Sequence, residues 1–426
     1  MIQSDPHAHG TVQNPTAGRT SVVDVPGSIS VEPVELIAED GALSRGLLYR
    51  PVGKTPRVGV HLMHPRTDQS TNYNILPLAR AGYTVLGRAG RWPNNDSATT
   101  HEHLLLDLAA GIRRLRDVGC DEVVLLGNSG GSSLAAFYQA QASAAAGELL
   151  CHTAAGDPFD LNRFDLPLAD ALVIVGGHIG QGGIMGKLID PAVIDENDPL
   201  ATDPAIDLYN PDNGFREPAR SSQFDAAFLA RYRDGQAARM RRIDARALAW
   251  IQRQREAREI VEKLGDAAPV AQIRAAALEP HMIVFRTTAY PAFVDTSIEP
   301  DGRPVTSYFS TTPHLENFGA SGFGRYITPR AWLSTWSETY SHAQTIPNLA
   351  KSDKPLLIVH YSGDCGTRMS EARQMFDTAA AADKTMEVVE GIDHYGLRIA
   401  ADGSKGERVW TGTNLVIDWL KARFPV

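Results

Sequence analysis

The sequence has few cysteines, no long apolar run and little net charge for its length. Its 426 residues include three widely separated cysteines, which match neither a zinc pattern nor a disulfide framework. No stretch approaches the roughly 18 apolar residues of a membrane span, and MIQSDPHAHG lacks the regions of a secretory signal. A formal charge of −9 gives no nucleic-acid footprint. We therefore expect a cytoplasmic protein whose partner is a small-molecule substrate, with no nucleic acid or membrane partner and with a homodimer left open.

The sequence that is present alternates strand and helix patterns. Residues 1–29 lack periodic apolar positions and are predicted to form an irregular arm, and residues 31–51 alternate like two antiparallel strands that turn at Asp40-Gly41. Further along, apolar strands follow in RVGVHLMHP, YTVLGRAGR, EVVLLGNS, ALVIVGG, PLLIVHYSGD and TMEVVEG. Strands that are apolar throughout are typical of a parallel sheet covered on both faces. We predict an α/β fold with a mostly parallel sheet and helices on both faces.

Helices are predicted between these strands. Residues 101–118 carry apolar positions at helical spacing, and the small residues of GGSSLAAFYQAQASAAA favour a helix packed closely on a sheet. Further helices are predicted in STNYNILPLARAGY, in TRMSEARQMFDTAAAA and from about residue 407 to 422.

The alternation stops between residues 181 and 350. This segment begins rich in Pro and Asp, continues as an Arg-rich helical region over residues 221–264, and then allows a short strand or two and another helix near 328–350. Because the parallel pattern resumes afterwards, residues 30–180 and 351–426 are predicted to form the core. Residues 181–350 are predicted to form a large, mainly helical cap over the strand ends, where ligands bind in open α/β sheets.

The Arg-rich region predicts an amphipathic helix with a kink or break at Gly235. The residues expected on its inward face are Phe224, Phe228, Tyr232, Met240, Ile243 and Ile251. The arginines expected on its solvated outer face are Arg231, Arg239, Arg242, Arg246 and Arg253. Several aromatic residues of the insertion could line a pocket or fill the cap's own core: Tyr290, Phe293, Phe318, Phe323 and Trp332.

The segment Gly127-Asn128-Ser129-Gly130-Gly131 fits the G-x-S-x-G pattern between an apolar strand and a helix. Glycines two positions either side of the serine allow a sharp strand-to-helix turn that exposes a nucleophile. A phosphate loop would need G-x-G-x-x-G spacing or a Lys-Ser/Thr ending, and neither is present. Ser321 in GASGFG misses the pattern because Phe323 replaces the second glycine. Ser129 is therefore the predicted nucleophile.

A serine hydroxyl needs a base to take its proton and a carboxylate to hold that base. Asp364 follows the strand LLIVHYSG, and His394 lies in a loop between MEVVEG and the last helix, so both fit the Ser-Asp-His chain order. Asp393 is a weaker candidate for the acid, because neighbouring side chains rarely face one another. His360 and His342 are better explained as core or surface histidines.

The tetrahedral intermediate needs N–H donors directed at its oxyanion. The Gly130 N–H, directly after the nucleophile, is the first expected donor. In the loop after RVGVHLM, Pro65 has no N–H, so the Arg66 backbone is the expected second donor, with Thr67 less favoured. The Arg66 side chain could grip a substrate carboxylate or form a surface salt bridge. His64 in this loop and His178 in the Gly-rich stretch 176–183 are candidate substrate contacts, although that stretch could simply be a loop leaving the sheet.

These motifs resemble the α/β-hydrolase family, in which Ser129, Asp364, His394 and Gly130 match the nucleophile, acid, base and oxyanion positions. The resemblance covers roughly residues 30–180 and 350–426, and it departs at Pro65, where many relatives carry glycine, and in the large insertion. It implies the α/β-hydrolase fold and a serine hydrolase.

A carboxylesterase that forms an acyl-enzyme is the first functional hypothesis. A lactonase, an amidase or a carbon–carbon bond hydrolase would use the same triad, and a non-catalytic ligand-binding homologue is disfavoured by the intact triad. No cofactor is expected. The acidic run from Asp190 to Asp207 fails calcium-loop spacing, so no metal is expected either.

Overall fold

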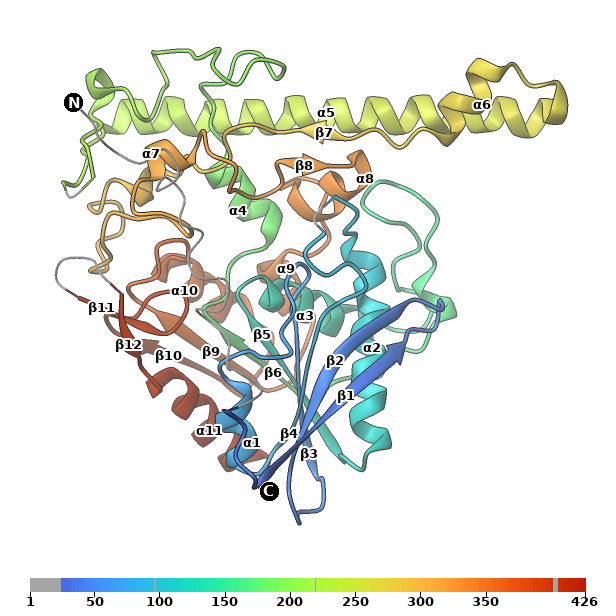
Figure 1. The fold of residues 1–426 in the computed structure, drawn as a ribbon, viewed down its shortest axis with the longest axis vertical. Helices are drawn as coiled ribbons and strands as arrows, with labels where there is room; N and C mark the ends of the chain where they lie inside the picture. Colours follow the sequence, from blue (N-terminus) through green and yellow to red (C-terminus); the bar gives the residue numbers. More distant parts are fainter. Residues whose placement is uncertain (1–23, 96, 219, 401–404) are drawn as a thin grey trace.

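The computed structural model describes residues 24–95, 97–218, 220–400 and 405–426, so most of the predicted arm 1–29 lies outside the described residues. An eight-stranded sheet with the order β1-β2-β4-β3-β5-β6-β9-β10 forms the centre (Figure 1). Its strands are β1 (Ile29–Ile37), β2 (Leu43–Pro51), β3 (Val58–Met63), β4 (Thr84–Arg88), β5 (Glu122–Asn128), β6 (Ala171–Val175), β9 (Leu356–Tyr361) and β10 (Lys384–Val389).

The strand directions confirm the predicted fold class. β2 is antiparallel to β1 and to β4, and every other neighbouring pair of the large sheet is parallel. This is the mostly parallel sheet of the α/β-hydrolase fold. The predicted antiparallel pair near the start of the chain is also confirmed, with Leu36 opposite Ser44 beside the turn at Asp40-Gly41.

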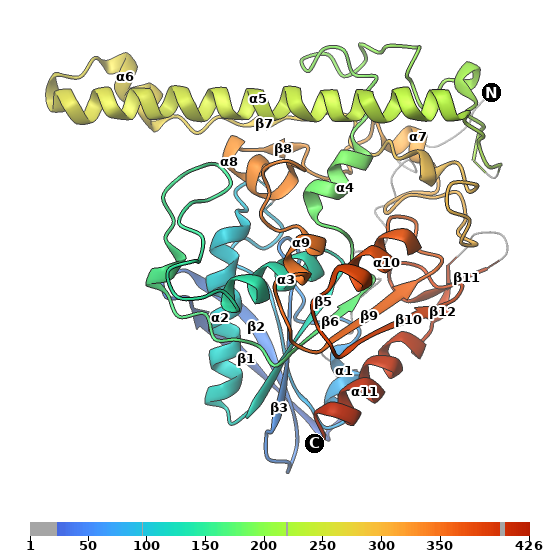
Figure 2. The ribbon, with the colours of Figure 1, turned by 180° about the vertical axis from the view of Figure 1, so that it is seen from behind.

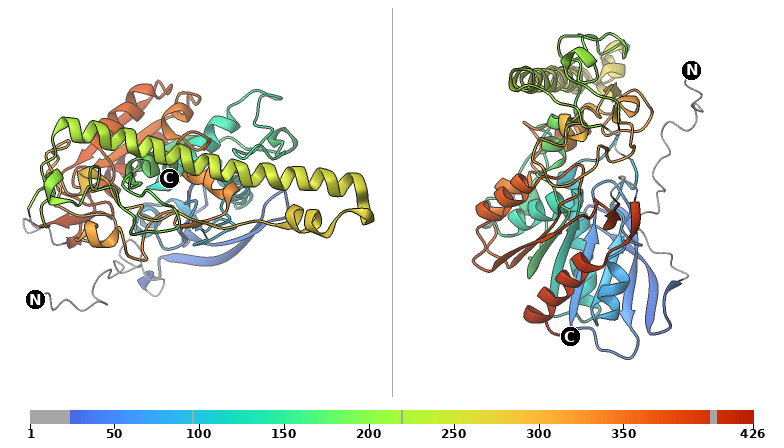
Figure 3. Two further views of the ribbon diagram at one scale, coloured as in Figure 1. Left: turned by 90° about the horizontal axis from the view of Figure 1, so that it is seen from above. Right: turned by 90° about the vertical axis from the view of Figure 1, so that its left-hand side faces the viewer.

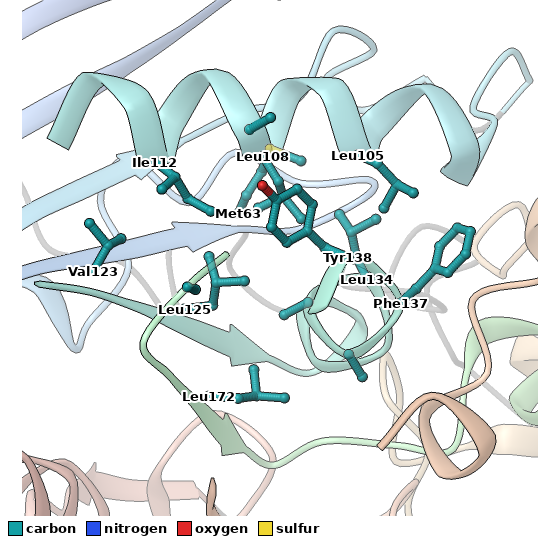
Figure 4. Close-up of a cluster of buried hydrophobic side chains, with 14 of the residues drawn as sticks. Met63, Leu105, Leu108, Ile112, Val123, Leu125, Leu134, Phe137, Tyr138 and Leu172 are labelled. Carbon is teal, nitrogen blue, oxygen red and sulfur yellow. The ribbon is translucent and has the colours of Figure 1, made fainter. Parts of the chain in front are cut away.

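Helices cover both faces of the sheet, which explains why its strands are apolar throughout. On β5, Val123 and Leu125 face α2 (His101–Asp117) and α3 (Gly130–Ala142), as Figure 4 shows. Val124 and Leu126 point to the opposite face, which packs with α1 (Ile75–Arg80) and α11 (Thr411–Arg423). Each such buried side chain contributes about 1.5–3 kcal/mol through removal from water. α1 is shorter than predicted, and α11 begins four residues after the expected start.

The segment between β6 and β9 forms a layer on the side toward which the parallel strands run. Figures 1 and 2 show α5 (Ala226–Leu264) crossing above the sheet, and the view from above in Figure 3 shows it lying across the width of the molecule. α4 (Gln181–Leu188) rises from the sheet toward α5, and α6 (Val270–Ala277) folds back against the end of α5. The predicted limits of the cap, residues 181 and 350, stay a prediction.

The kink or break expected at Gly235 is absent, because α5 is continuous over 39 residues. A Cβ at position 235 would lie 2.8 Å from the Cβ of Pro191. The glycine therefore allows α5 to lie directly on the loop after α4, and this close approach explains the residue better than a change of helix direction.

The face assignment is confirmed for the predicted apolar residues that lie within α5 and wrong for Arg239, while Phe224 is half-buried and lies before the helix begins. Phe228, Tyr232, Met240, Ile243 and Ile251 are all buried. Arg239 is also fully buried: its Nε and Nη2 each lie 2.8 Å from a carboxylate oxygen of Glu196, and it donates to the backbone oxygens of Asp190 and Phe285. Position 239 lies seven after Tyr232 and four before Ile243, so helical spacing places it on the inward face.

The rest of the insertion is less regular than predicted. Instead of one helix near 328–350, the chain forms α8 (Pro329–Ala331), the π turn η6 (Trp332–Trp336) and α9 (Thr345–Leu349). Serine side chains compete for backbone groups here, since Ser341 Oγ donates to the Ser334 oxygen and Ser337 Oγ accepts the Tyr340 N–H.

The remaining elements are short or follow the core strands. They are η2 (Leu161–Arg163), η3 (Pro211–Asn213), η4 (Gly265–Ala267), η5 (Pro291–Phe293), α7 (Pro313–Glu316), α10 (Met369–Thr378), and the antiparallel pairs β7 (Met282–Ile283) with β8 (Tyr326–Ile327) and β11 (Leu397–Ile399) with β12 (Lys405–Arg408). Of the helices described, none combines the length and apolar character that a bilayer span requires.

Replacing Arg239 with methionine should lower the free energy of unfolding by about 3 kcal/mol, because Glu196 and two backbone oxygens lose their buried partner. Urea denaturation followed by circular dichroism measures the change. Arg241→Met is the matched control on the exposed side of α5 and should change the free energy by less than about 0.5 kcal/mol. Equal unfolding midpoints for the two variants would contradict this account of Arg239.

Candidate active site

The turn at Ser129 has a backbone conformation that a serine rarely adopts. Ser129 lies between β5 and α3 with φ 55° and ψ −125°. The chain comes so close to its neighbours that a Cβ at Gly127 would lie 2.5 Å from the Cα of Ser132, and one at Gly131 would lie 2.6 Å from the Met63 oxygen. Both glycines of the motif are therefore required by backbone crowding. The turn leaves the serine side chain at the carboxyl edge of the sheet.

The structure brings the three predicted triad residues into contact. His394 Nε2 lies 2.9 Å from Ser129 Oγ, and His394 Nδ1 lies 2.5 Å from Asp364 Oδ2. Asp364 follows β9 and His394 follows β10, and both side chains are buried. The second carboxylate oxygen of Asp364 accepts the Gly366 N–H at 2.8 Å, which holds the carboxylate in place.

The weaker candidates do not make the contacts predicted for a base or its carboxylate. Asp393 Oδ1 accepts the backbone N–H groups of Tyr395 and Leu397, each at 2.8 Å, so this carboxylate shapes the loop around His394. His360 is buried within β9, and His342 Nδ1 lies 2.9 Å from Glu102 Oε1. Asp364 is the carboxylate that contacts the imidazole of His394.

The electrostatics of Asp364 and His394 suit a base held by a carboxylate. Burial by itself would raise the pKa of Asp364, but its charge interaction and hydrogen bond with His394 hold that pKa well below its usual range. Burial also disfavours the charged, protonated form of His394 and by itself would lower its pKa. The adjacent Asp364 outweighs this effect and raises the pKa of His394. With the Nδ1 hydrogen directed at Asp364, Nε2 can accept the Ser129 proton.

The Arg66 backbone does not match its expected role as the second oxyanion donor. The N–H groups of both Arg66 and Thr67 donate to His64 Nδ1, at 3.0 and 3.1 Å. The loop after β3 folds around the His64 ring, and this turns the two N–H groups toward the ring. Gly130 remains in place as the first residue of α3, where a helix N–H has no partner within its own helix.

His64 and His178, the two candidate substrate contacts, meet at Gly130. A Cβ at position 130 would lie 2.8 Å from His64 Nε2 and 3.4 Å from His178 Nε2. Gly130, the residue directly after Ser129, is therefore flanked by both ring edges. Contact with a substrate stays a prediction for both histidines.

The Arg66 side chain contacts the insertion. Its guanidinium lies 4.8 Å from the centre of the Phe323 ring and 5.3 Å from that of Trp336. Phe323 also packs on Tyr308, and the ring of Tyr308 stands edge-on to His394 with 5.3 Å between centroids. Sequence reasoning missed Tyr308 and Trp336, because no motif links them to the triad across such chain distances.

The other aromatic residues of the insertion divide between core and surface. Phe293 and Trp332 are fully buried in its hydrophobic clusters, and Tyr290 is buried beside Phe293. Phe318 is half exposed and lies over the guanidinium of Arg286 at 4.7 Å.

Two members of the acidic run pair with cationic and amide side chains, and Asp198, Asp203 and Asp207 accept backbone N–H groups two residues further on. Asp190 contacts Arg286 at 2.7 Å and accepts from Asn317 Nδ2 at 2.7 Å, while Glu196 holds Arg239. Across the described ranges, no three His, Cys, Asp or Glu side chains gather in a way that could hold a metal ion.

The strand order and the serine turn define the class of protein: the chain has the α/β-hydrolase fold. It is similar to the α/β-hydrolase GrgF from Penicillium sp. sh18, with 13% identity over 93% of this chain and 100% of that one and a TM-score of 0.43. It is also similar to the esterase domain of a Rhodothermus marinus protein, with 14% identity over 92% and 98% of the two chains and a TM-score of 0.40. No protein-family model and no curated protein sequence matches the chain.

Replacing Asp364 with asparagine should lower the pKa of His394 below the usual value of about 6.5, because burial then acts without the opposing carboxylate. Two-dimensional NMR of the ¹⁵N-labelled imidazole across a pH titration measures this pKa. Asp393→Asn is the matched control, since Asp393 is a smaller contributor, and it should produce a smaller fall. A pKa of His394 that is unchanged in Asp364→Asn would contradict the assignment.

Proposed function

We propose that the protein is a serine hydrolase that cleaves a carboxylic ester of a small organic molecule. The observation that carries the proposal is the aligned contact from Ser129 Oγ through His394 to Asp364, at a strained turn that opens a helix. A hydroxyl, a base and an orienting carboxylate in this geometry form the arrangement that activates serine for acyl transfer.

In the proposed reaction, Ser129 Oγ attacks the ester carbonyl carbon while His394 Nε2 takes the hydroxyl proton. The tetrahedral intermediate collapses, the bond to the leaving alkoxide breaks, and His394 returns the proton to that oxygen. A water molecule, deprotonated by His394, then attacks the acyl-enzyme. The second tetrahedral intermediate collapses, the bond to Ser129 Oγ breaks, and His394 returns the proton to that oxygen as the acid is released. Asp364 holds the Nδ1 hydrogen and stabilises the imidazolium that forms in each half-reaction.

The same attack would begin cleavage of a lactone, an amide or a carbon–carbon bond next to a carbonyl. The carboxylic ester is preferred because an alkoxide leaves more readily than an amide nitrogen or a carbanion and needs the least assistance beyond the triad. Parallel assays with p-nitrophenyl esters of several lengths, lactones and aryl amides distinguish these bonds.

A fluorophosphonate probe should label the wild-type protein, and Ser129→Ala should abolish the labelling and reduce kcat for ester hydrolysis by at least about 10⁴-fold, because no other group replaces the nucleophile. Intact-protein mass spectrometry and initial rates measure the two effects. Ser321→Ala is the matched control, since it removes the other serine in a Gly-rich run, and it should behave as wild type. Labelling that persists in Ser129→Ala would refute the proposal.

The value of kcat/KM should rise with pH and reach half its plateau above about pH 6.5, because His394 acts as a base only when it is unprotonated and its pKa is raised. Initial rates at low substrate concentration across pH 4–9 give the profile. A plateau already established at pH 5 would show that the group with the raised pKa is not the base.

A further inference from the structure

Two histidines from different loops direct the same ring atom at one point beside the nucleophile. His64 follows β3 and His178 follows β6, and both Nε2 atoms lie around the place where a side chain on Gly130 would begin, at 2.8 and 3.4 Å. Any larger residue at position 130 would displace the His64 ring. The glycine therefore keeps this point open between Ser129 and the two rings.

The backbone determines which ring nitrogen of each histidine carries the hydrogen. His64 Nδ1 accepts the N–H groups of Arg66 and Thr67, and His178 Nδ1 accepts the Gly180 N–H at 3.1 Å. A nitrogen that accepts a hydrogen bond carries no hydrogen, so in the neutral imidazole the hydrogen lies on Nε2. Both rings therefore present an N–H donor toward Gly130.

Burial keeps both rings neutral. It lowers the pKa of His178 to about 3, with nearby His394 adding to the effect, and it lowers the pKa of His64 to well below its usual value, with nearby Arg66 adding to the effect. Neither ring competes with His394 as a base across the neutral range.

The two Nε2–H groups have no acceptor among the described residues, although both histidines are buried. Neither Nε2 atom is among the fully buried side-chain atoms that lack a partner, so both donors stay accessible to the acceptor of a bound ligand. The loop of His178 is also held in place, because Thr345 Oγ1 of α9 donates to the His178 oxygen at 2.6 Å.

We propose that His64 and His178 are catalytic residues whose Nε2–H groups bind the oxyanion of the tetrahedral intermediate, together with the Gly130 N–H. This inference rests on the proposed hydrolase function. It also accounts for the departure at Pro65. Proline has no N–H, and the Arg66 N–H is directed at the His64 ring, so a side-chain donor from His64 replaces the missing backbone donor. Neutral, preoriented donors of this kind stabilise charge that appears only in the transition state.

Asparagine and glutamine substitutions separate the two nitrogens of each ring. His64→Asn and His178→Asn retain an acceptor near Nδ1, and so the loop hydrogen bonds, but remove the Nε2 donor. His64→Gln and His178→Gln place an amide N–H near Nε2 instead. Each Asn variant should lose about 10²–10³-fold in kcat on a p-nitrophenyl ester with KM changed by less than about threefold, and each Gln variant should recover at least tenfold of that loss.

A transition-state analogue supplies the second measurement. Ser129 Oγ adds to the carbonyl carbon of a trifluoromethyl ketone and forms a hemiketal oxyanion. The inhibition constant of this ketone should therefore rise in the Asn variants in proportion to the fall in kcat/KM. Binding of the matching alcohol, which forms no oxyanion, should stay unchanged. The exposed His152→Asn variant controls for the general effect of this substitution.

The failures of the two proposals are distinguishable. If the wild type does not turn over esters, or Ser129→Ala retains the activity, the hydrolase function fails first. If the wild type is active and Ser129-dependent but the Asn variants keep kcat within threefold, or the Gln variants lose as much as the Asn variants, the oxyanion role is overturned and the hydrolase function stands.

Discussion

The chain passes from β5 into α3 through one serine with a positive φ, and the surrounding backbone forces it into that conformation. A conformation of this kind costs on the order of 1–3 kcal/mol for a residue with a Cβ, and it persists only where neighbours over-determine it. Here the Ser129 N–H donates to the Val175 oxygen of β6, and the Ser129 oxygen accepts the Ser132 N–H of α3. The Met63 oxygen comes too close for any side chain at Gly131. The sheet and the helix together therefore hold the serine where His394 can reach it.

A parallel sheet explains how residues so far apart in the chain meet at this serine. The carboxyl ends of parallel strands lie at one edge, so residues that follow different strands become neighbours. The residues that follow β3, β5, β6, β9 and β10 at that edge are His64, Ser129, His178, Asp364 and His394. The edge brings together the proposed nucleophile, base and acid and the two proposed oxyanion donors, and the insertion adds aromatic side chains to the same place.

The insertion depends on buried charge pairs as well as on apolar packing. Arg239 with Glu196 and Arg286 with Asp190 tie the irregular loop after α4 to α5 and to the strand segment near β7. Such pairs add little net stability compared with apolar residues of similar size, but losing one partner is costly. They therefore fix the position of a loop that has almost no regular secondary structure of its own.

The sequence by itself determined the order and type of the core elements, because apolar alternation and helical spacing are local properties of the chain. It also determined Ser129, Asp364 and His394 as candidates, since the strand ends that carry them could be recognised one at a time. Only the tertiary structure decided that the buried Arg239 pairs with Glu196, that Tyr308 stands against His394, and that the Arg66 N–H is directed at His64. Each of these depends on a partner distant in the chain or on the path of a loop. Spacing along one element carries no information about either.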